Sequence, residues 1–236
     1  LPVTSTLPLV LVPGLLCSAR LYAPQVAALW PLGQVSVANH RRDADMAAIA
    51  ARILAEAPPR FALAGLSMGG YIAFAMMRLA PERIAKLALL DTSARPDMPE
   101  QKAGREKLIG MAEEGKLADV VEMLAPRFLH RDRVNDDELR REIRAMAKDT
   151  GADAFVREMK AIMGRADSRP LLASIKCPTL VLVGEGDELT PPELSKEMAG
   201  GIAGATLNVL PGCGHLSTLE KPDAVNAALT GWLTAS

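Results

Sequence analysis

The sequence is poor in cysteine, histidine and aromatic residues, and it contains no long apolar run. Only three cysteines occur in 236 residues, at Cys17, Cys177 and Cys213. An odd, widely spaced set is typical neither of a disulfide framework nor of a metal-ligand cluster, so we expect reduced thiols and no metal site. No stretch approaches the roughly 20 consecutive apolar residues that a membrane-spanning helix needs.

The charge is nearly balanced, which argues against a polyanionic partner. Lys and Arg number 27, Asp and Glu number 28, and both signs are scattered along the chain. We therefore expect a small-molecule partner, with no nucleic acid and no membrane span. The first residues, LPVTSTLPLV, contain no basic segment leading into an apolar one. This predicts no intact secretory signal and a cytoplasmic protein, unless a signal was removed before residue 1.

Short apolar runs alternate with longer stretches of helical periodicity. Two of the helical stretches are expected at 43–57 and 222–233, where apolar residues recur on one face. The apolar runs are PLVLV at 8–12, QVSVA at 34–38, FALAGL at 61–66, IAKLALL at 84–90, TLVLV at 179–183 and ATLNVL at 205–210. This alternation predicts an α/β fold, with a mostly parallel sheet covered by helices on both faces.

The alternation stops between the fourth and fifth runs, and helical segments follow one another there. Examples are the amphipathic stretches 116–129 and 136–149. We expect a sheet domain formed by 1–94 and 171–236, with a helical cap inserted at 95–170. Six of the 11 methionines lie in the insertion. Because methionine adapts to irregular apolar surroundings, they can serve core packing or line a flexible acyl pocket, with Met123 and Met163 as candidates.

The segment GLSMGG, residues 65–70, matches the pattern G-x-S-x-G. It directly follows the apolar run FALAGL and directly precedes the helical run YIAFAMMRLA, which is the context that a nucleophile elbow requires. The two glycines leave room for a sharp strand-to-helix turn that exposes the serine hydroxyl. The sequence therefore predicts Ser67 as a nucleophile.

A serine nucleophile needs a base, and the chain has only three histidines, His40, His130 and His215. His215 is the predicted general base, because it lies in the glycine-flanked loop PGCGHLS immediately after the last predicted strand. His130 lies in the charged segment FLHRDR and is expected at the surface. His40 follows the run QVSVA and is a candidate for contact with substrate at the mouth of the site.

A carboxylate must orient the imidazole, and two aspartates follow predicted strands. Asp187 lies in GEGDELTPP after TLVLV, and Asp91 lies in LLDTSARP after IAKLALL. With Asp187 the triad has the chain order Ser, Asp, His that this kind of elbow uses. Its loop also ends at Pro191 and Pro192, as a helix start should, so Asp187 is favoured. Asp91 remains the alternative, with a structural role at a strand end as its other interpretation.

An oxyanion hole requires two N–H donors near the nucleophile. One comes from the residue after the serine and one from the loop after the first strand, which predicts the backbones of Met68 and Leu15. Leu16 is a further candidate for lining the substrate site. Neither Cys17 nor Cys213 has a second set of triad partners, so both are expected to be small packed residues.

With the elbow, the acid loop and the histidine loop in this order, the sequence resembles the α/β-hydrolase superfamily over its whole length, specifically its small cap-bearing serine esterases. The stretch LPGCGHLSTLEKPDAVNAAL resembles 3-oxoadipate enol-lactonases and related bacterial esterases. The resemblance implies Ser67, Asp187 and His215 as the triad, with Leu15 and Met68 as oxyanion donors. Two segments depart from it. Pro13-Gly14 replaces the usual His-Gly, and ANHRRDADM replaces the usual D-x-R-G-x-G-x-S.

The predicted function is cleavage of carboxylic esters through an acyl-enzyme, without a metal or an organic cofactor. An apolar, partly open cleft would accept varied acyl chains and a segment of an aliphatic polyester. The alternative within enzymes is an enol-lactonase or a carbon–carbon bond hydrolase with the same triad. The alternative of another class is a non-catalytic small-molecule receptor on the same fold.

Overall fold

Six parallel strands form one sheet in the computed structural model, which describes residues 7–235. The expectation about a secretory signal falls mainly on residues 1–6, which lie outside the described residues. All six predicted runs form strands, in the spatial order β2-β1-β3-β4-β5-β6. The strands are β1 (Leu9–Val12), β2 (Val35–Val37), β3 (Phe61–Leu66), β4 (Ile84–Leu90), β5 (Thr179–Gly184) and β6 (Thr206–Leu210). The prediction of a mostly parallel sheet is confirmed.

The central strands are apolar on both sides because each side of the sheet is covered. Leu9 and Leu11 of β1 point into one hydrophobic core, whereas Val10 and Val12 point into a second. Every residue of β1, β3 and β5 is buried, as expected for strands between two helical layers. The register pairs Val12 with Gly65, which brings the end of β1 beside the end of β3.

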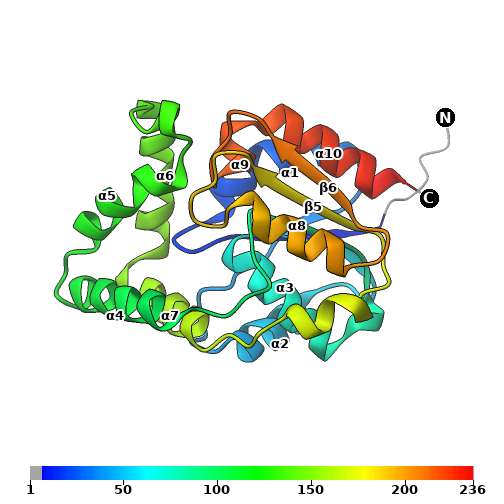
Figure 1. The fold of residues 1–236 in the computed structure, drawn as a ribbon, viewed down its shortest axis with the longest axis horizontal. Helices are drawn as coiled ribbons and strands as arrows, with labels where there is room; N and C mark the ends of the chain where they lie inside the picture. The colour runs from blue at the N-terminus through cyan, green and yellow to red at the C-terminus, as the bar shows by residue number, and fades with distance from the viewer. Residues whose placement is uncertain (1–6, 236) are drawn as a thin grey trace.

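Helices form a layer on each face of the sheet. Figure 1 shows α1 and α10 on one face and α2, α3 and α8 on the other. The helices are α1 (Ala23–Leu29), α2 (Met46–Glu56), α3 (Met68–Leu79), α4 (Pro99–Glu113), α5 (Leu117–Phe128), α6 (Asp137–Thr150), α7 (Ala152–Met163), α8 (Pro192–Gly201), α9 (Ser217–Glu220) and α10 (Pro222–Thr234). The helices expected at 43–57 and 222–233 correspond to α2 and α10.

Four consecutive helices, α4 to α7, connect β4 to β5. In Figure 1 they stand to one side of the sheet, and α4 packs on α7 and α5, which in turn packs on α6. Most of their buried apolar residues join the core on the α1 and α10 side of the sheet, whereas Ala161 and Ile162 of α7 join the core on the other side. The stretches predicted to be helical at 116–129 and 136–149 are α5 and α6.

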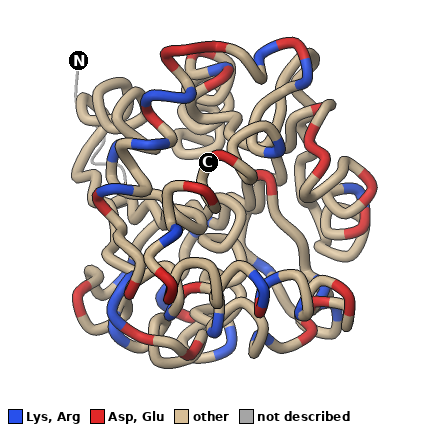
Figure 2. The backbone as a smooth tube through the Cα atoms, turned by 90° about the vertical axis from the view of Figure 1, so that its left-hand side faces the viewer, with Lys and Arg blue, Asp and Glu red and all other residues tan. Residues whose placement is uncertain are grey.

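The sheet geometry brings loops that are distant in sequence to a common edge. Because all strands are parallel, the loops after β1, β2, β3, β4, β5 and β6 all leave the same carboxyl edge, where open α/β sheets bind ligands. Figure 2 shows acidic and basic residues interspersed along much of the backbone. Within residues 7–235, no helix combines the length and the apolar character needed to cross a membrane.

Candidate active site

Ser67 lies at a sharp turn between β3 and α3. Its backbone has a φ of 55° and a ψ of −115°, a left-handed conformation that non-glycine residues rarely adopt. Glycines make the turn possible, since an added Cβ at Gly65 would lie 2.2 Å from the Gly69 carbonyl oxygen. Thr92 Oγ1 donates a 2.8 Å hydrogen bond to the Ser67 carbonyl oxygen. These contacts hold the serine in its strained conformation at the carboxyl edge of the sheet.

The side chains of Ser67, His215 and Asp187 form a continuous hydrogen-bond chain. His215 Nε2 lies 2.8 Å from Ser67 Oγ, and His215 Nδ1 lies 2.8 Å from Asp187 Oδ2. An ionised carboxylate only accepts, so Nδ1 carries the proton and Nε2 is left to accept from the serine hydroxyl. The three residues come from the loops after β3, β5 and β6, so the parallel sheet brings them together.

The loop that carries His215 is fixed by the insertion. The backbone N–H groups of His215 and Leu216 both donate to the Phe128 carbonyl oxygen, at 3.1 Å each. The Phe128 ring stacks on the imidazole with its centroid 6.2 Å away. Burial lowers the pKa of His215, but the charge and hydrogen bond of Asp187 outweigh it and leave the pKa above its ordinary value of 6.5.

Asp187 is held by its own loop as well as by the histidine. Its Oδ1 accepts from the backbone N–H groups of Leu189 and Thr190, at 2.8 and 2.9 Å, and its Oδ2 accepts from Thr190 Oγ1 at 2.7 Å. Burial raises the pKa of Asp187, whereas the charge of His215 and these hydrogen bonds lower it, and the pKa is below its ordinary value. The carboxylate is therefore ionised and fixed in orientation.

Asp91, the alternative acid, is buried beside this chain but makes other contacts. It accepts a 2.9 Å hydrogen bond from the Gly184 backbone N–H and another from Ser217 Oγ. Burial raises its pKa well above the ordinary value, and the charge of Asp187 raises it further. Asp91 thus links the end of β5 to the histidine loop without a hydrogen bond to the imidazole.

Met68 directly follows the serine in the chain, and Leu15 lines the same cavity as Ser67. Within residues 7–235 the backbone N–H of neither residue has a hydrogen-bond acceptor. The loop approaches the elbow so closely that a Cβ on Gly14 would lie 3.3 Å from Ser67 Cβ. Met68 is the first residue of α3, so the positive end of a helix dipole also faces this point. Two free donors beside a serine hydroxyl are suited to an oxyanion.

A cavity of about 820 Å³ opens over Ser67 and His215, between the sheet edge and the insertion. Met123, one of the residues predicted to line the substrate site, contributes to its wall. Leu16, His40 and Met163 lie outside this wall: Leu16 and Met163 pack in the core, and His40 is buried beside Glu158. The apolar lining includes Leu15, Leu66, Pro96, Met98, Leu108, Met123, Leu124, Phe128, Met159, Ile162, Leu189, Leu194 and Leu216.

The same cavity also carries positive charge. The Asp97 carboxylate pairs with two arginines, Arg105 and Arg165, at 2.7 Å each. Lys107 and Arg127 also line the cavity, and neither forms an ion pair with a described residue. The wall therefore holds more positive than negative groups close to its apolar surface.

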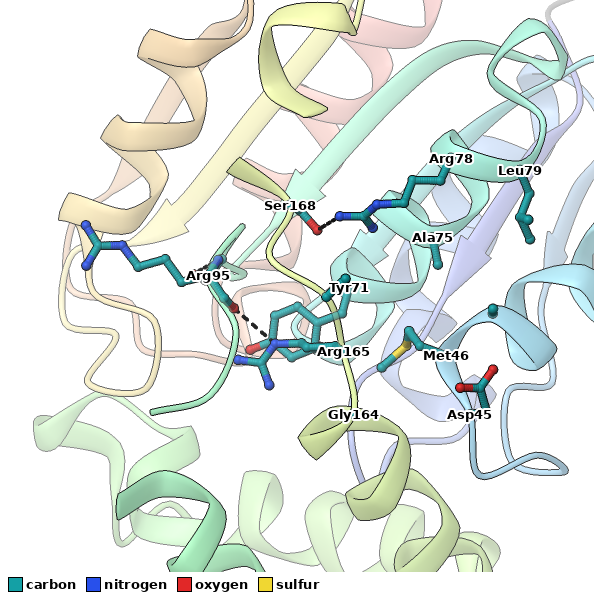
Figure 3. Close-up of a pocket in the computed structure, with 13 residues that line it drawn as sticks. Asp45, Met46, Tyr71, Ala75, Arg78, Leu79, Arg95, Gly164, Arg165 and Ser168 are labelled. Carbon is teal, nitrogen blue, oxygen red and sulfur yellow. Dashed lines mark hydrogen bonds between the residues drawn. The ribbon is translucent and has the colours of Figure 1, made fainter. Parts of the chain in front are cut away.

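A second, smaller cavity of about 190 Å³ lies behind this wall (Figure 3). Arg165 lines both cavities, with its guanidinium 4.2 Å from the centroid of the Tyr71 ring and its Nε hydrogen-bonded to the Arg95 carbonyl oxygen. Ser67 and His215 do not line the smaller cavity. The smaller cavity therefore adjoins the larger one without reaching the serine or the histidine.

The remaining histidine and the buried cysteines have local contacts. His130 Nδ1 accepts from the Asp132 backbone N–H at 3.3 Å, and its side chain is 13% exposed, so it is less exposed than predicted. Burial raises the pKa of the Cys17 and Cys213 thiols far above the ordinary value. Both thiols are consequently protonated and unreactive near neutral pH.

Three residues near the site escaped the sequence analysis. Thr190 follows Asp187 by three residues, a spacing that suits a side-chain bond back to the carboxylate. Phe128 contributes its backbone carbonyl, for which no sequence signal exists. Glu158 did leave a signal, because it is a charged residue on the face of α7 that also carries buried Phe155 and Met159.

Comparison with known proteins places this geometry in a family. The profile of the alpha/beta hydrolase family matches residues 9–228. A pimeloyl-acyl-carrier-protein methyl ester esterase of Neisseria meningitidis is 27% identical over 215 residues, covering 86% of this chain and 83% of that protein.

Solved structures give the same result. A thermophilic esterase from Thermogutta terrifontis is 32% identical with a TM-score of 0.88, and the match covers 97% of this chain and 90% of the esterase chain. An enol-lactonase from Burkholderia xenovorans LB400 is 26% identical with a TM-score of 0.86, and the match covers 97% of this chain and 92% of the enol-lactonase chain. The resemblance noted in the sequence is confirmed at the level of family and fold.

Proposed function

The chain belongs to the alpha/beta hydrolase family, and from this premise we propose that it is a serine esterase that cleaves carboxylic esters through an acyl-enzyme. One observation carries the proposal: Ser67 Oγ and Asp187 Oδ2 each lie 2.8 Å from opposite nitrogens of the His215 ring. This arrangement takes the proton from a serine hydroxyl and stabilises the imidazolium that results. The similarity to two esterases supports the choice of ester chemistry.

In the first half-reaction Ser67 Oγ attacks the ester carbonyl carbon, and its proton passes to His215 Nε2. The carbonyl π electrons move to the oxygen, which becomes an oxyanion and accepts hydrogen bonds from the Leu15 and Met68 N–H groups. When the carbonyl re-forms, the carbon–oxygen bond to the alcohol breaks. His215 Nε2–H protonates the leaving oxygen, and the acyl group remains on Ser67.

In the second half-reaction water attacks the acyl-enzyme with His215 as the base. The tetrahedral intermediate again places its negative oxygen on the two N–H groups. Collapse breaks the bond to Ser67 Oγ, which recovers its proton from His215, and the carboxylic acid leaves. Asp187 remains ionised throughout and keeps the imidazole in the tautomer that both steps need.

The cavity suggests the acyl groups that suit this site. Its apolar wall favours extended chains through burial of methylenes, at about 0.8 kcal/mol for each one. Lys107 and Arg127, without acidic partners among the described residues, favour a carboxylate at the far end of such a chain. A lactone with a carboxylate would satisfy the same features, so an enol-lactonase is the second candidate, supported by the similarity to one.

A fluorophosphonate probe and a substrate panel test the proposal. The panel contains p-nitrophenyl esters, half-esters of dicarboxylic acids, simple lactones and a carbon–carbon substrate. Wild type and Ser174→Ala, which changes an exposed serine, should be labelled and should hydrolyse esters. Ser67→Ala should do neither. A wild-type protein that binds the panel compounds without labelling or turnover would instead indicate a receptor, and exclusive turnover of lactones would favour the second candidate.

A further inference from the structure

A buried pair, His40 and Glu158, contacts the backbone on both sides of Leu15. We propose that these are positioning residues that hold the loop 13–17, here called the oxyanion loop, with the Leu15 N–H directed at Ser67. The inference rests on the proposed function, in which that N–H stabilises the oxyanion. It extends the site to a residue of α7 in the insertion.

Glu158 is a carboxylate inside the protein rather than at its surface. Its side chain is 0% exposed, and its partner His40 is 1% exposed. Oε1 lies 3.0 Å from His40 Nε2, and Oε2 accepts a 3.0 Å hydrogen bond from the Leu16 backbone N–H. No Lys or Arg of residues 7–235 forms an ion pair with it. The carboxylate therefore contacts the oxyanion loop with Oε2 and His40 with Oε1.

His40 acts on the peptide that contains the proposed donor. Its Nε2 lies 3.1 Å from the Gly14 carbonyl oxygen, and since a carbonyl only accepts, Nε2 carries the proton. The Gly14 carbonyl and the Leu15 N–H belong to one planar trans peptide, so they point in opposite directions. A bond that holds the carbonyl on the His40 side consequently turns the N–H to the other side, toward the serine. Cys17 N–H, at 3.1 Å from the same carbonyl, assists.

Glu158 fixes the next peptide. Leu16 has a φ of 58°, in the left-handed region. Residues other than glycine rarely adopt this conformation, because their Cβ atom makes it sterically costly. Such a conformation persists only where surrounding contacts over-determine it. The hydrogen bond from the Leu16 N–H to Glu158 Oε2 is one of those contacts. Together, the two residues hold the peptides on either side of Leu15, which leaves the loop little freedom to rotate its N–H away.

Apolar packing does not account for this pair. Polar side chains are costly to remove from water, so apolar side chains would fill the same buried space at a lower cost in free energy. Phe155, Met159 and Ile162 on the same face of α7 are already apolar and buried. A leucine at 158 would suit that face for packing, but it would leave the Leu16 N–H without an acceptor.

The test compares His40→Ala, Glu158→Ala and Glu158→Gln with Glu113→Gln, a control at an exposed position of α4. Fluorophosphonate titration counts active sites, so that kcat is expressed per labelled serine. Affinity for a boronic acid that forms a tetrahedral adduct on Ser67 reports the oxyanion hole directly. His40→Gln provides a rescue, because its amide N–H can donate to the Gly14 carbonyl.

Loss of an oxyanion donor costs about 10²–10³ in kcat, so misorientation of one in the two alanine variants should cost about 10- to 100-fold. KM should remain within about twofold, boronate affinity should fall in parallel with kcat, and His40→Gln should recover most of the loss. Glu158→Gln keeps an acceptor for Leu16 and should lie between wild type and Glu158→Ala. The control should match wild type.

Unchanged kcat and boronate affinity per labelled site, with only the melting temperature lowered, would overturn the inference and leave the proposed function intact. If the alanine variants do not fold, His40→Leu and Glu158→Met decide, since both keep much of the side-chain volume but remove the donor to Gly14 and the acceptor for Leu16. Wild-type values for both would then overturn the inference. Failure of wild type itself to label or hydrolyse esters would instead refute the proposed function, and this inference with it.

Discussion

Replacement of Asp187 by Asn tests the central hydrogen-bond chain at its most specific point. Asp187 accepts from two backbone N–H groups with Oδ1 and from His215 with Oδ2. An asparagine has one oxygen, which the two backbone donors would hold, so its NH₂ would face His215 Nδ1. That contact requires Nδ1 to accept and therefore moves the imidazole proton to Nε2. In that tautomer the histidine no longer accepts the proton of Ser67.

The expected loss in kcat is roughly 10⁴-fold, or about 5.4 kcal/mol of transition-state stabilisation. The matched control is Asp91→Asn, because Asp91 is equally buried but bonds to Gly184 and Ser217 instead of the imidazole. We expect this control to lose less than about tenfold, since an asparagine can accept from the Gly184 N–H. The assay is ester hydrolysis per labelled serine, with circular dichroism to verify the fold.

The pH profile gives an independent measure of the same contact. His215 must be neutral to act as a base, so activity falls as the pH drops through its pKa. Because Asp187 raises that pKa above 6.5, the acid limb of kcat/KM in wild type should lie above pH 6.5. In Asp187→Asn the acid limb should move to lower pH, since burial still lowers the pKa of His215 but the charge of Asp187 no longer raises it. A large loss in Asp91→Asn, with Asp187→Asn near wild type, would refute the assignment of the acid.

Three further predictions address the nucleophile, the cavity and the stability of the sheet. Ser67→Ala and His215→Ala should each lower kcat by about 10⁴-fold or more. The double variant should lose little more, because the two groups act as a unit. Strict additivity of the two losses in kcat, measured by steady-state kinetics, would contradict this. The value of kcat/KM should rise up to a few-fold per carbon over short to medium acyl chains and then level off. An emulsified aliphatic polyester should release soluble acid. A sharp optimum at one small ester or lactone, without polymer hydrolysis, would argue against an open cleft. Lys86 Nζ donates hydrogen bonds to the Trp232, Leu233 and Ala235 carbonyl oxygens at the end of α10. Lys86→Met should therefore lower the free energy of unfolding, measured by urea denaturation, by about 1–3 kcal/mol. Equal midpoints and slopes for the two proteins would show that these hydrogen bonds add nothing to stability.

Local sequence signals were sufficient for the strands and the serine turn. Runs such as FALAGL are apolar at every position because both faces of the sheet are covered, and this holds for any chain that forms such a sheet. The glycines of GLSMGG are needed for close contacts near the serine and between neighbouring strands, so their spacing, together with the apolar run before it and the helical run after it, predicts the elbow. The parallel order then brings all strand ends to one edge, which made His215 a candidate from its position after the last strand.

The choice between Asp187 and Asp91 needed the tertiary structure. Both aspartates follow strands and both lie between Ser67 and His215 in the chain, so the sequence favours Asp187 without excluding Asp91. The difference lies in which carboxylate oxygen comes within hydrogen-bond distance of Nδ1, and the loop backbone around residues 187–190 decides this.

Contacts across the insertion were beyond the reach of the sequence for a similar reason. His40 was considered for substrate contact, but the fold places it against the Gly14 carbonyl and beside Glu158 of α7. Glu158 and Leu16 are 142 residues apart, and no local pattern specifies which acceptor a buried backbone N–H will find at that separation. The sequence by itself therefore determined the sheet, the elbow and the residue types of the site, because these depend on neighbours along the chain. Only the tertiary structure decided which carboxylate orients the histidine and what holds the oxyanion loop, because those contacts depend on how distant loops and helices pack together.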